Sequence, residues 1–195
     1  MADERELIKK AQSGDMDAFE EIVRLYEKRV YSLALKMTQN PQDAFDASQE
    51  VFIKIYNFLP SFKWESSFYT WVYRITVNKC IDINRKLKRQ RTFSIDVQDE
   101  DYPAIEIPDE VDSPEMRYGK KEAMEAVMRA LDKLSDEHKA VIILRDIKGL
   151  SYLEIAQAVD CSEGTVKSRI SRAREKLREI LEKKGNFFDD AASYS

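Results

Sequence analysis

Glycine and proline are scarce in this 195-residue chain, which contains five of each. Such a composition suits helices that are joined by few tight turns. Long apolar runs are absent as well, and no stretch is long enough to cross a lipid bilayer. The N-terminal residues lack the pattern of a secretory signal peptide, so we expect a cytoplasmic protein.

Residues with catalytic or metal-binding chemistry are also few. The two cysteines, Cys80 and Cys161, stand alone in helical contexts, which favours buried thiols over a disulfide or a metal pair. His138 is the single histidine, and we expect it to be exposed in the first turn of a helix. The sequence has no paired carboxylates in a pocket-like context, no glycine-rich phosphate loop and no metal-ligand spacing. It therefore predicts a binding protein with no catalytic residues, metal, cofactor or small-molecule substrate.

Charge is unevenly distributed along the chain. The formal net charge is −4, which argues against a protein that coats nucleic acid indiscriminately. Nine acidic residues and three prolines lie between Ser94 and Glu115, where there is no lysine or arginine. This segment is too charged to be buried and too rich in proline for a helix, which indicates an acidic flexible linker. Hydrophobic residues make up 43% of the chain, which is enough for folded cores around the linker.

The stretch from Leu150 to Leu181 has the pattern of a helix-turn-helix with a basic second helix. Ser151 stands three residues before Glu154, which is the capping-box spacing at the start of a first helix. Ser162 can cap a second helix that begins at Glu163. Apolar residues recur along this second helix at spacings of three and four, which predicts one buried stripe. The stripe consists of Val166, Ile170, Ala173, Leu177 and Ile180.

Short polar and basic side chains lie opposite or beside that stripe. A buried stripe backed by such side chains suits a helix that lies in the DNA major groove. An amphipathic hairpin with a solvated charged face would show the same period. The short turn, and the absence of acids between Glu163 and Glu175, favour DNA recognition. The polar and basic residues are Lys167, Ser168, Arg169, Ser171, Arg172 and Arg174.

Three helices are predicted before residue 59. The first spans residues 4–13 and ends at Gly14, and the second follows an apolar period from Phe19 to Met37. Asn40 can cap the third helix, which runs to about Phe58. From residue spacing alone, the polar edge of this helix is interpreted as an ordinary solvent-exposed face. That edge consists of Asp43, Asp46, Gln49 and Glu50.

An aromatic loop at residues 59–70 leads into a helix with a basic end. Phe68 and Trp71 are expected in the core, whereas Phe62 and Trp64 are expected to be exposed, where aromatic rings can stack on unpaired bases. Asn78 lies on the helix and can hydrogen-bond a base edge. The helix then enters a cluster without acids that is suited to phosphate binding. The cluster consists of Arg85, Lys86, Lys88, Arg89 and Arg91.

These patterns predict an all-α protein of two small helical domains joined by the acidic linker. The first domain spans residues 1–93 and the linker spans residues 94–113. The second domain spans residues 114–184, because Ser113 and Pro114 are a helix cap and a first-turn proline. Gly185 is expected to end the last helix and to leave residues 185–195 as a disordered tail.

Four stretches in this order resemble a bacterial RNA polymerase sigma factor of the extracytoplasmic-function group, in the sigma-70 family. The resemblance covers about Lys9 to Leu181. Its first two stretches are the more specific ones, because other helix-turn-helix regulators share the last. The stretches are residues 43–52 (DAFDASQEVF), 68–75 (FYTWVYRI) with Asn78, 144–156 (LRDIKGLSYLEIA) and 164–174 (GTVKSRISRAR).

The resemblance implies a role for each surface. The third-helix edge would dock on the clamp helices of the polymerase β′ subunit, which replaces the solvated-face interpretation, and the protein would also contact the β flap. The linker would run toward the active site and the RNA exit path. The docking residues would be Asp46, Gln49 and Glu50. The −10 element would be melted and read by Phe62, Trp64, Arg74, Asn78, Arg85 and Lys86. The −35 element would be read by Arg145, Lys167, Ser168, Ser171, Arg172 and Arg174.

The resemblance also implies regulation by a partner. An anti-sigma factor, often membrane-tethered in this group, would cover the DNA-reading faces of a monomeric protein. Two other interpretations stay open from the residues alone. One is an autonomous helix-turn-helix regulator that binds duplex DNA as a dimer. The other is a hydrolase or nuclease, which the missing acid–base and metal clusters disfavour.

Overall fold

The computed structural model describes residues 4–93 and 125–192, with side chains at residues 4–90 and 125–183. Every regular element in these residues is helical, which confirms the all-α prediction. The N-terminal domain contains α1 (Glu4–Gln12), α2 (Met16–Thr38), α3 (Pro41–Phe58), the short 3₁₀ turn η1 (Leu59–Ser61) and α4 (Phe68–Phe93). The C-terminal domain contains a helical segment at residues 125–132, α6 (Asp136–Ile142), the π-helical η2 (Ile143–Ile147), α7 (Tyr152–Ala158) and α8 (Glu163–Ala192).

Side-chain caps fix most of the helix starts. The side chain of Asn40 accepts hydrogen bonds from the backbone N–H groups of Gln42 and Asp43 at 2.8 and 3.1 Å, with Pro41 in the first turn of α3. These contacts pair N–H groups that have no partner within the helix. Gly14 has a φ of +95° after α1, a conformation that glycine adopts without strain. The predicted cap and stop signals at these positions are confirmed.

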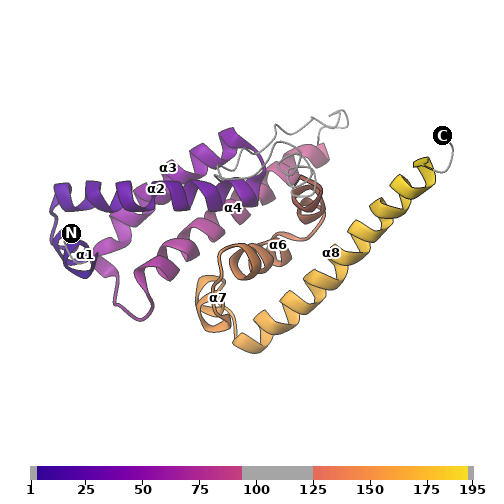
Figure 1. Cartoon of the computed structure of the whole chain (residues 1–195). Helices are drawn as coiled ribbons and strands as arrows, with labels where there is room; N and C mark the ends of the chain where they lie inside the picture. Colours follow the sequence, from indigo (N-terminus) through magenta and orange to yellow (C-terminus); the bar gives the residue numbers. More distant parts are fainter. Residues whose placement is uncertain (1–3, 94–124, 193–195) are drawn as a thin grey trace, which may run out of the picture.

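The N-terminal domain is a bundle in which α2 packs against α3 and α4 (Figure 1). The faces predicted from helical spacing are the faces that are buried. Phe68 and Trp71 are 4% and 7% exposed, which confirms the prediction that they belong to the core. The buried face of α3 consists of Ala44, Ala47, Ser48, Val51 and Ile55.

The C-terminal domain encloses its core between α6, α7 and α8. Ser135 caps α6 and accepts a hydrogen bond from the backbone N–H of His138. Gly149, with a φ of +74°, follows η2 and turns the chain toward α7. The predicted stripe of α8 is confirmed at Val166, Ile170 and Ala173, which are buried, whereas Leu177 and Ile180 are half-buried.

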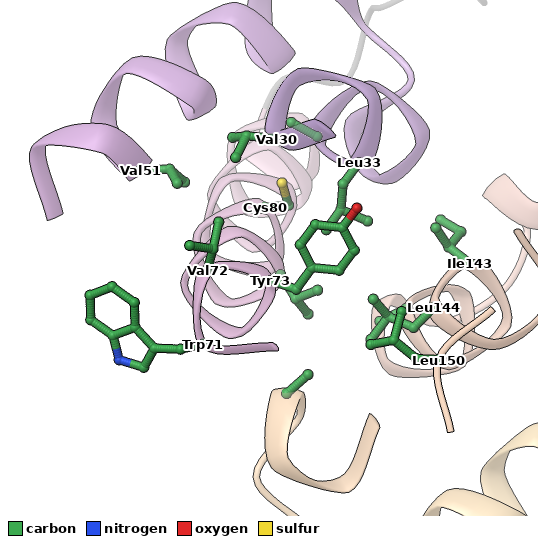
Figure 2. Packing of buried hydrophobic residues seen from close by; sticks show 14 of the residues in the cluster. Val30, Leu33, Val51, Trp71, Val72, Tyr73, Cys80, Ile143, Leu144 and Leu150 are labelled. Carbon is green, nitrogen blue, oxygen red and sulfur yellow. The ribbon is translucent and has the colours of Figure 1, made fainter. Parts of the chain in front are cut away.

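The two domains share one hydrophobic cluster. Alpha-helix α4 packs on α6 and α7, and α2 also contacts α6 and η2. In Figure 2, Leu33 and Tyr73 lie on the side of the N-terminal core that faces Ile143, Leu144 and Leu150. All five of these side chains are at most 2% exposed. The domains are therefore packed together, while α8 extends away from the body (Figure 1).

Three sequence expectations need correction. Helix α8 continues through Gly185 to Ala192, because a single glycine costs a helix only about 1 kcal/mol and does not end it without a further stop signal. Cys161 was expected to be buried but is half-buried in the turn before α8. His138 was expected to be exposed but is half-buried in α6. Cys80 is fully buried, as predicted. The expected linker and the helix start at Ser113 lie outside the described residues.

Candidate nucleic-acid interface

The N-terminal half of α8 presents a polar and basic face to solvent. Val166, Ile170 and Ala173 point into the core, which leaves the opposite face of the helix outside. Serine, lysine and arginine side chains on an exposed helix face are suited to hydrogen-bond base edges in a DNA major groove. The exposed residues, all predicted for the −35 element, are Lys167, Ser168, Ser171, Arg172 and Arg174.

The turn before α8 is held by local hydrogen bonds. Ser151 and Glu154 form the predicted capping box of α7, in which the Ser151 backbone N–H donates to the Glu154 carboxylate at 2.8 Å. Contacts from the hydroxyl and the backbone N–H of Ser151 lower the pKa of Glu154. Ser162 accepts a hydrogen bond from the backbone N–H of Thr165 at 3.2 Å. These caps fix the angle at which α8 leaves α7.

Four of the predicted −35 residues have partners within the protein. One is Ser168, whose hydroxyl donates to the carbonyl oxygen of Thr165 at 2.9 Å. Arg145 is half-buried and donates to the carbonyl oxygen of Leu150 at 2.7 Å, and its guanidinium lies 4.8 Å from the ring centroid of Tyr152. The Lys167 ammonium lies 5.6 Å from the centroid of the same ring. Both cations are within the range of a cation–π contact. Tyr152 thus holds Arg145 and Lys167 beside each other.

Arg174 is held in the same way by an acidic residue. Its guanidinium forms two hydrogen bonds with the Asp146 carboxylate, one of them from Nε at 3.2 Å, and this pairing raises the pKa of Arg174. A bidentate pair fixes the plane of the guanidinium. The sequence did not indicate this partner, since Asp146 and Arg174 are 28 positions apart.

The basic end of α4 lies on the surface of the N-terminal domain. Arg74 and Asn78 are exposed on the same helix, which places four of the predicted −10 residues on α4. Arg85 also donates to the Glu137 carboxylate of α6 at 3.1 Å. The residues that line a shallow surface pocket here are Asp82, Arg85, Lys86, Arg89 and Gln90.

The expectation that Phe62 is exposed is wrong. Its side chain is only 6% exposed and contacts the rings of Trp64, Phe68 and Trp71 at centroid distances of 5.0 to 5.5 Å. Burial of a large ring in an aromatic cluster outweighs its position in a loop. Trp64 is half-buried, and the guanidinium of Arg5 lies 5.3 Å from its ring centroid. Neither ring is freely available for base stacking in this conformation.

The polar edge of α3 is exposed and lies beside apolar side chains. Asp46, Gln49 and Glu50 all face solvent, and Glu50 forms an ion pair with Lys79 of α4. Phe45 and Ile53 are 51% and 61% exposed, one helical turn before and after Gln49. The sequence analysis missed these two residues. Their position outside the core stripe of α3 was the available signal, because a large apolar residue off the buried face often marks an interface.

No group of three or more histidine, cysteine, aspartate or glutamate side chains is placed to hold a metal ion within residues 4–90 and 125–183. Within the helices that the structure describes, none is long and apolar enough to cross a membrane.

Burial raises the pKa of the Cys80 thiol to about 12, which keeps it protonated.

Comparison with known families identifies both domains. The family model for sigma-70 region 2 matches residues 22–91, and the family model for sigma-70 region 4 matches residues 124–177. The chain belongs to the sigma-70 family. This sigma factor binds core RNA polymerase and directs it to promoters through their −10 and −35 elements, so that transcription can begin.

Relatives assign the chain to the extracytoplasmic-function group. The sigma factor is 37% identical to the ECF RNA polymerase sigma-E factor of Escherichia coli over 173 residues, which is 88% of this chain and 90% of that protein. It is 34% identical to the RNA polymerase sigma-H factor of Pseudomonas aeruginosa over 182 residues, which is 92% of this chain and 94% of that protein.

A solved structure has a similar fold. The sigma factor RpoE of Bartonella quintana, crystallised with the anti-sigma factor NepR, aligns with a TM-score of 0.66 and 27% identity. The alignment covers 84% of this chain and 96% of the chain in that structure.

Proposed function

We propose that the exposed face of α8 reads the −35 element. The observation that carries the proposal is the placement of Lys167, Ser168 and Arg172 on the solvent side of α8. The opposite side of the helix is buried at Val166, Ile170 and Ala173. Arginine and lysine can donate hydrogen bonds to guanine in the major groove. A serine hydroxyl can donate to or accept from several different bases. Arg145 and Arg174, fixed by Tyr152 and Asp146, would contact the phosphates on either side.

Helix α4 would recognise the −10 element. Asn78 and Arg74 are exposed in the middle of the helix, where they can reach base edges, and the basic end offers contacts to the DNA backbone. Phe62 contributes to this surface indirectly, because its buried ring packs against the ring of the half-buried Trp64. Reading a single strand in this way requires the duplex to be opened.

The exposed edge of α3 would dock on the β′ clamp helices. Asp46, Gln49 and Glu50 supply charge and hydrogen-bonding groups, and the neighbouring Phe45 and Ile53 supply apolar area. Interfaces commonly have this combination of an apolar centre and a polar rim. The β flap would bind the C-terminal domain.

The protein itself would perform no catalysis, since phosphodiester synthesis belongs to the polymerase. It would act in the cytoplasm and would be held inactive by an anti-sigma factor. The support for such a partner comes from a relative, the RpoE of Bartonella quintana, whose structure contains the anti-sigma factor NepR.

Transcription in vitro tests the proposal directly. Core RNA polymerase and the purified protein would be incubated with a library of bacterial genomic fragments, and the transcript starts would be sequenced. We expect starts that depend on the protein and share two upstream elements at a fixed spacing. If no start depends on the protein, yet it shifts duplex fragments by itself, an autonomous regulator is the better account.

Substitutions in α3 test the docking edge separately. The double substitution Gln49→Ala and Glu50→Ala should weaken binding to core polymerase at least tenfold, because it removes both exposed polar groups. Its effect on folding should be small, since the Glu50–Lys79 pair lies at the surface. A matched control is Glu21→Ala with Glu27→Ala, at two exposed positions of α2. Equal affinities of the two variants would contradict the docking assignment.

A further inference from the structure

A group of cations lies where α2 of the N-terminal domain meets η2 of the C-terminal domain. Arg29, Ser32 and Lys36 share one face of α2, because they stand three and four positions apart on the helix. Lys148 directly follows η2, and its ammonium donates to the hydroxyl of Ser32 at 3.1 Å. We call these four residues the cation cluster, which contains groups from both domains.

The positive charges of the cation cluster act on one another. The pKa of Lys148 is lowered to about 8, first by burial and then by the charges of Lys36 and Arg29. Burial also lowers the pKa of Lys36. Both lysines are half-buried, so water screens their repulsion less than it would on an open surface. The fold therefore gathers three cations at a place where they repel one another.

Among the side chains that the structure describes, no carboxylate forms an ion pair with any of these three cations. Other lysines with little exposure do have such partners. The side chain of Lys139 is 3% exposed and pairs with Asp132 at 2.6 Å, and the side chain of Lys79 is 15% exposed and pairs with Glu50. Lysines are rarely buried without a partner. Uncompensated cations of this kind attract an anion from solution.

Two aromatic rings hold the guanidinium of Arg29. Its central carbon lies 5.6 Å from the ring centroid of Tyr26 and 5.7 Å from the ring centroid of Tyr69. Both distances are within the range of a cation–π contact, which attracts the cation through the face of the ring. A guanidinium held in this way keeps its N–H edge available to the oxygens of an anion. Arg29 can therefore bind an oxyanion with little loss of side-chain freedom.

The donors of the cation cluster suit a phosphate dianion. A phosphate monoester carries a charge of about −1.5 to −2 at pH 7 and has three strong acceptor oxygens. The cluster supplies a guanidinium edge, two ammonium groups and a hydroxyl. A single carboxylate, or one phosphodiester of a nucleic acid, carries only one negative charge and would leave most of the repulsion in place. The half-buried position of the two lysines also favours a small anion over a nucleic-acid backbone.

We propose that the cation cluster binds a phosphate dianion, either inorganic phosphate or the phosphate group of a small phosphomonoester. The proposal goes beyond the promoter function and does not depend on the roles assigned to α3, α4 and α8. The bound dianion offsets the repulsion among Arg29, Lys36 and Lys148 and accepts hydrogen bonds from both domains. Its binding should therefore raise the thermal stability of the free protein, and removal of one cation should abolish that effect.

Lysine acylation tests the site in the wild-type chain. The protein would be treated briefly with an N-hydroxysuccinimide ester of acetate at pH 7.5, in 10 mM phosphate or in sodium chloride of equal ionic strength. We expect phosphate to lower the acylation of Lys36 and Lys148 at least threefold, as measured by peptide mass spectrometry, because the anion covers these amines and keeps them protonated. Lys28, at an exposed position of α2, is the internal reference and should change little. Equal protection of all three lysines, or no protection of Lys36 and Lys148, would overturn the proposal.

Thermal unfolding with matched variants tests the same site. In 10 mM phosphate the wild-type Tm should rise by roughly 3 °C relative to sodium chloride of equal ionic strength, the shift expected for a ligand at about ten times its Kd. Lys36→Gln should abolish this rise, whereas Lys28→Gln removes the same charge from α2 and should retain it. A rise that survives Lys36→Gln would contradict the site. If Lys36→Gln does not fold, as circular dichroism would report, the acylation of the wild type decides alone.

Three ligands distinguish the sources of the phosphate group. Inorganic phosphate and adenosine monophosphate both supply a dianion, whereas a thymidine trinucleotide without a terminal phosphate supplies only diesters. A larger rise in Tm with adenosine monophosphate than with inorganic phosphate would support the site and assign it to a phosphomonoester. An equal or smaller rise would support the site and assign it to free phosphate. A rise with the trinucleotide that equals the rise with phosphate would overturn the proposal in favour of a nucleic-acid contact.

Discussion

At the scale of single residues, Lys148 is a cation in an unfavourable place. Its ammonium donates to the hydroxyl of Ser32 at 3.1 Å, across the contact between η2 and α2. Burial, together with the positive charges of Lys36 and Arg29, lowers the pKa of Lys148 to about 8. The folded protein therefore releases this proton at a lower pH than the unfolded chain, in which the lysine keeps its ordinary pKa near 10.5.

Replacement of Lys148 by methionine should stabilise the protein. At pH 7 the cost of the buried charge is fully present, so the variant should gain roughly 2–4 °C in Tm, the shift expected for about 1 kcal/mol in a chain of this size. Between pH 8 and pH 10 the wild type loses this cost, because its folded state releases the proton first. The difference in Tm should shrink over that range.

Calorimetry at pH 7 and pH 9.5 measures the effect. Lys28→Met, at an exposed position of α2, is the control and should shift Tm by less than about 1 °C at either pH. A Tm difference between Lys148→Met and the wild type that does not change with pH would contradict the assigned cause.

The two cysteines should differ sharply in reactivity. Cys80 is fully buried and its pKa is about 12, so almost no thiolate is present or accessible. Cys161 is half-buried in the turn before α8. Brief treatment of the native protein with iodoacetamide at pH 8 should modify Cys161 at least tenfold more than Cys80, as measured by peptide mass spectrometry. Treatment in guanidinium chloride should modify both, and equal labelling of the native protein would be inconsistent with the burial of Cys80.

At the scale of the elements, α7 depends on its cap more than a longer helix would. It has seven residues, which is too short for a stable helix on its own. The Ser151 hydroxyl accepts a hydrogen bond from the backbone N–H of Glu154 at 3.2 Å, and the Glu154 carboxylate returns a contact to Ser151. This reciprocal pairing fixes the first helix of the helix-turn-helix.

Removal of the cap should weaken both folding and DNA recognition. Ser151→Ala should cost about 1 kcal/mol of stability. The pKa of Glu154 is lowered in the folded state, so the cap's carboxylate contribution is present above the ordinary glutamate pKa and is lost as the pH falls through the folded value. Urea denaturation at pH 7 and pH 3.5 measures the loss of stability and its dependence on pH. Ser13→Ala, at the end of α1, is the control, and an equal loss at the two positions would contradict the capping argument.

Most helix boundaries were predictable from the sequence, because they depend on neighbouring residues, whereas the predicted helix end at Gly185 was wrong. The caps Asn40 and Ser151 and the stop at Gly14 act over a few positions. The burial of Phe62 was not predictable in this way. It belongs to a loop with no helical period, and its partners Phe68 and Trp71 lie in the first turn of α4, after the loop. Loop residues that enter a core give no periodic signal.

The same distinction holds for the candidate interface. The polar face of α8 followed from the spacing of its buried stripe. The partners Asp146 and Asp136 did not, since they meet Arg174 and Asn84 across 28 and 52 positions of the chain. The packing of α4 against α6, and of α8 against α6 and α7, decides which acid meets which partner, and a single sequence does not contain that register.

At the scale of the whole molecule, the shared core should make unfolding cooperative. Chains with two domains often unfold in separate steps. Here Leu33 and Tyr73 of one domain lie in the same buried cluster as Leu144 of the other, and Lys139 is hydrogen-bonded to Met37. Separation of the domains would expose these side chains to water and leave polar groups without their partners.

We therefore expect one calorimetric transition for the wild type, with equal van't Hoff and calorimetric enthalpies. The double variant Asp136→Asn with Glu137→Gln removes the charged contacts between α4 and α6 but keeps the apolar cluster. It should broaden the transition or split it into two, whereas Glu21→Gln with Glu27→Gln should leave a single transition. Two resolved transitions in the wild type at 50 mM NaCl would mean that the domains unfold independently. The shared cluster would then contribute too little to couple the unfolding of the two domains.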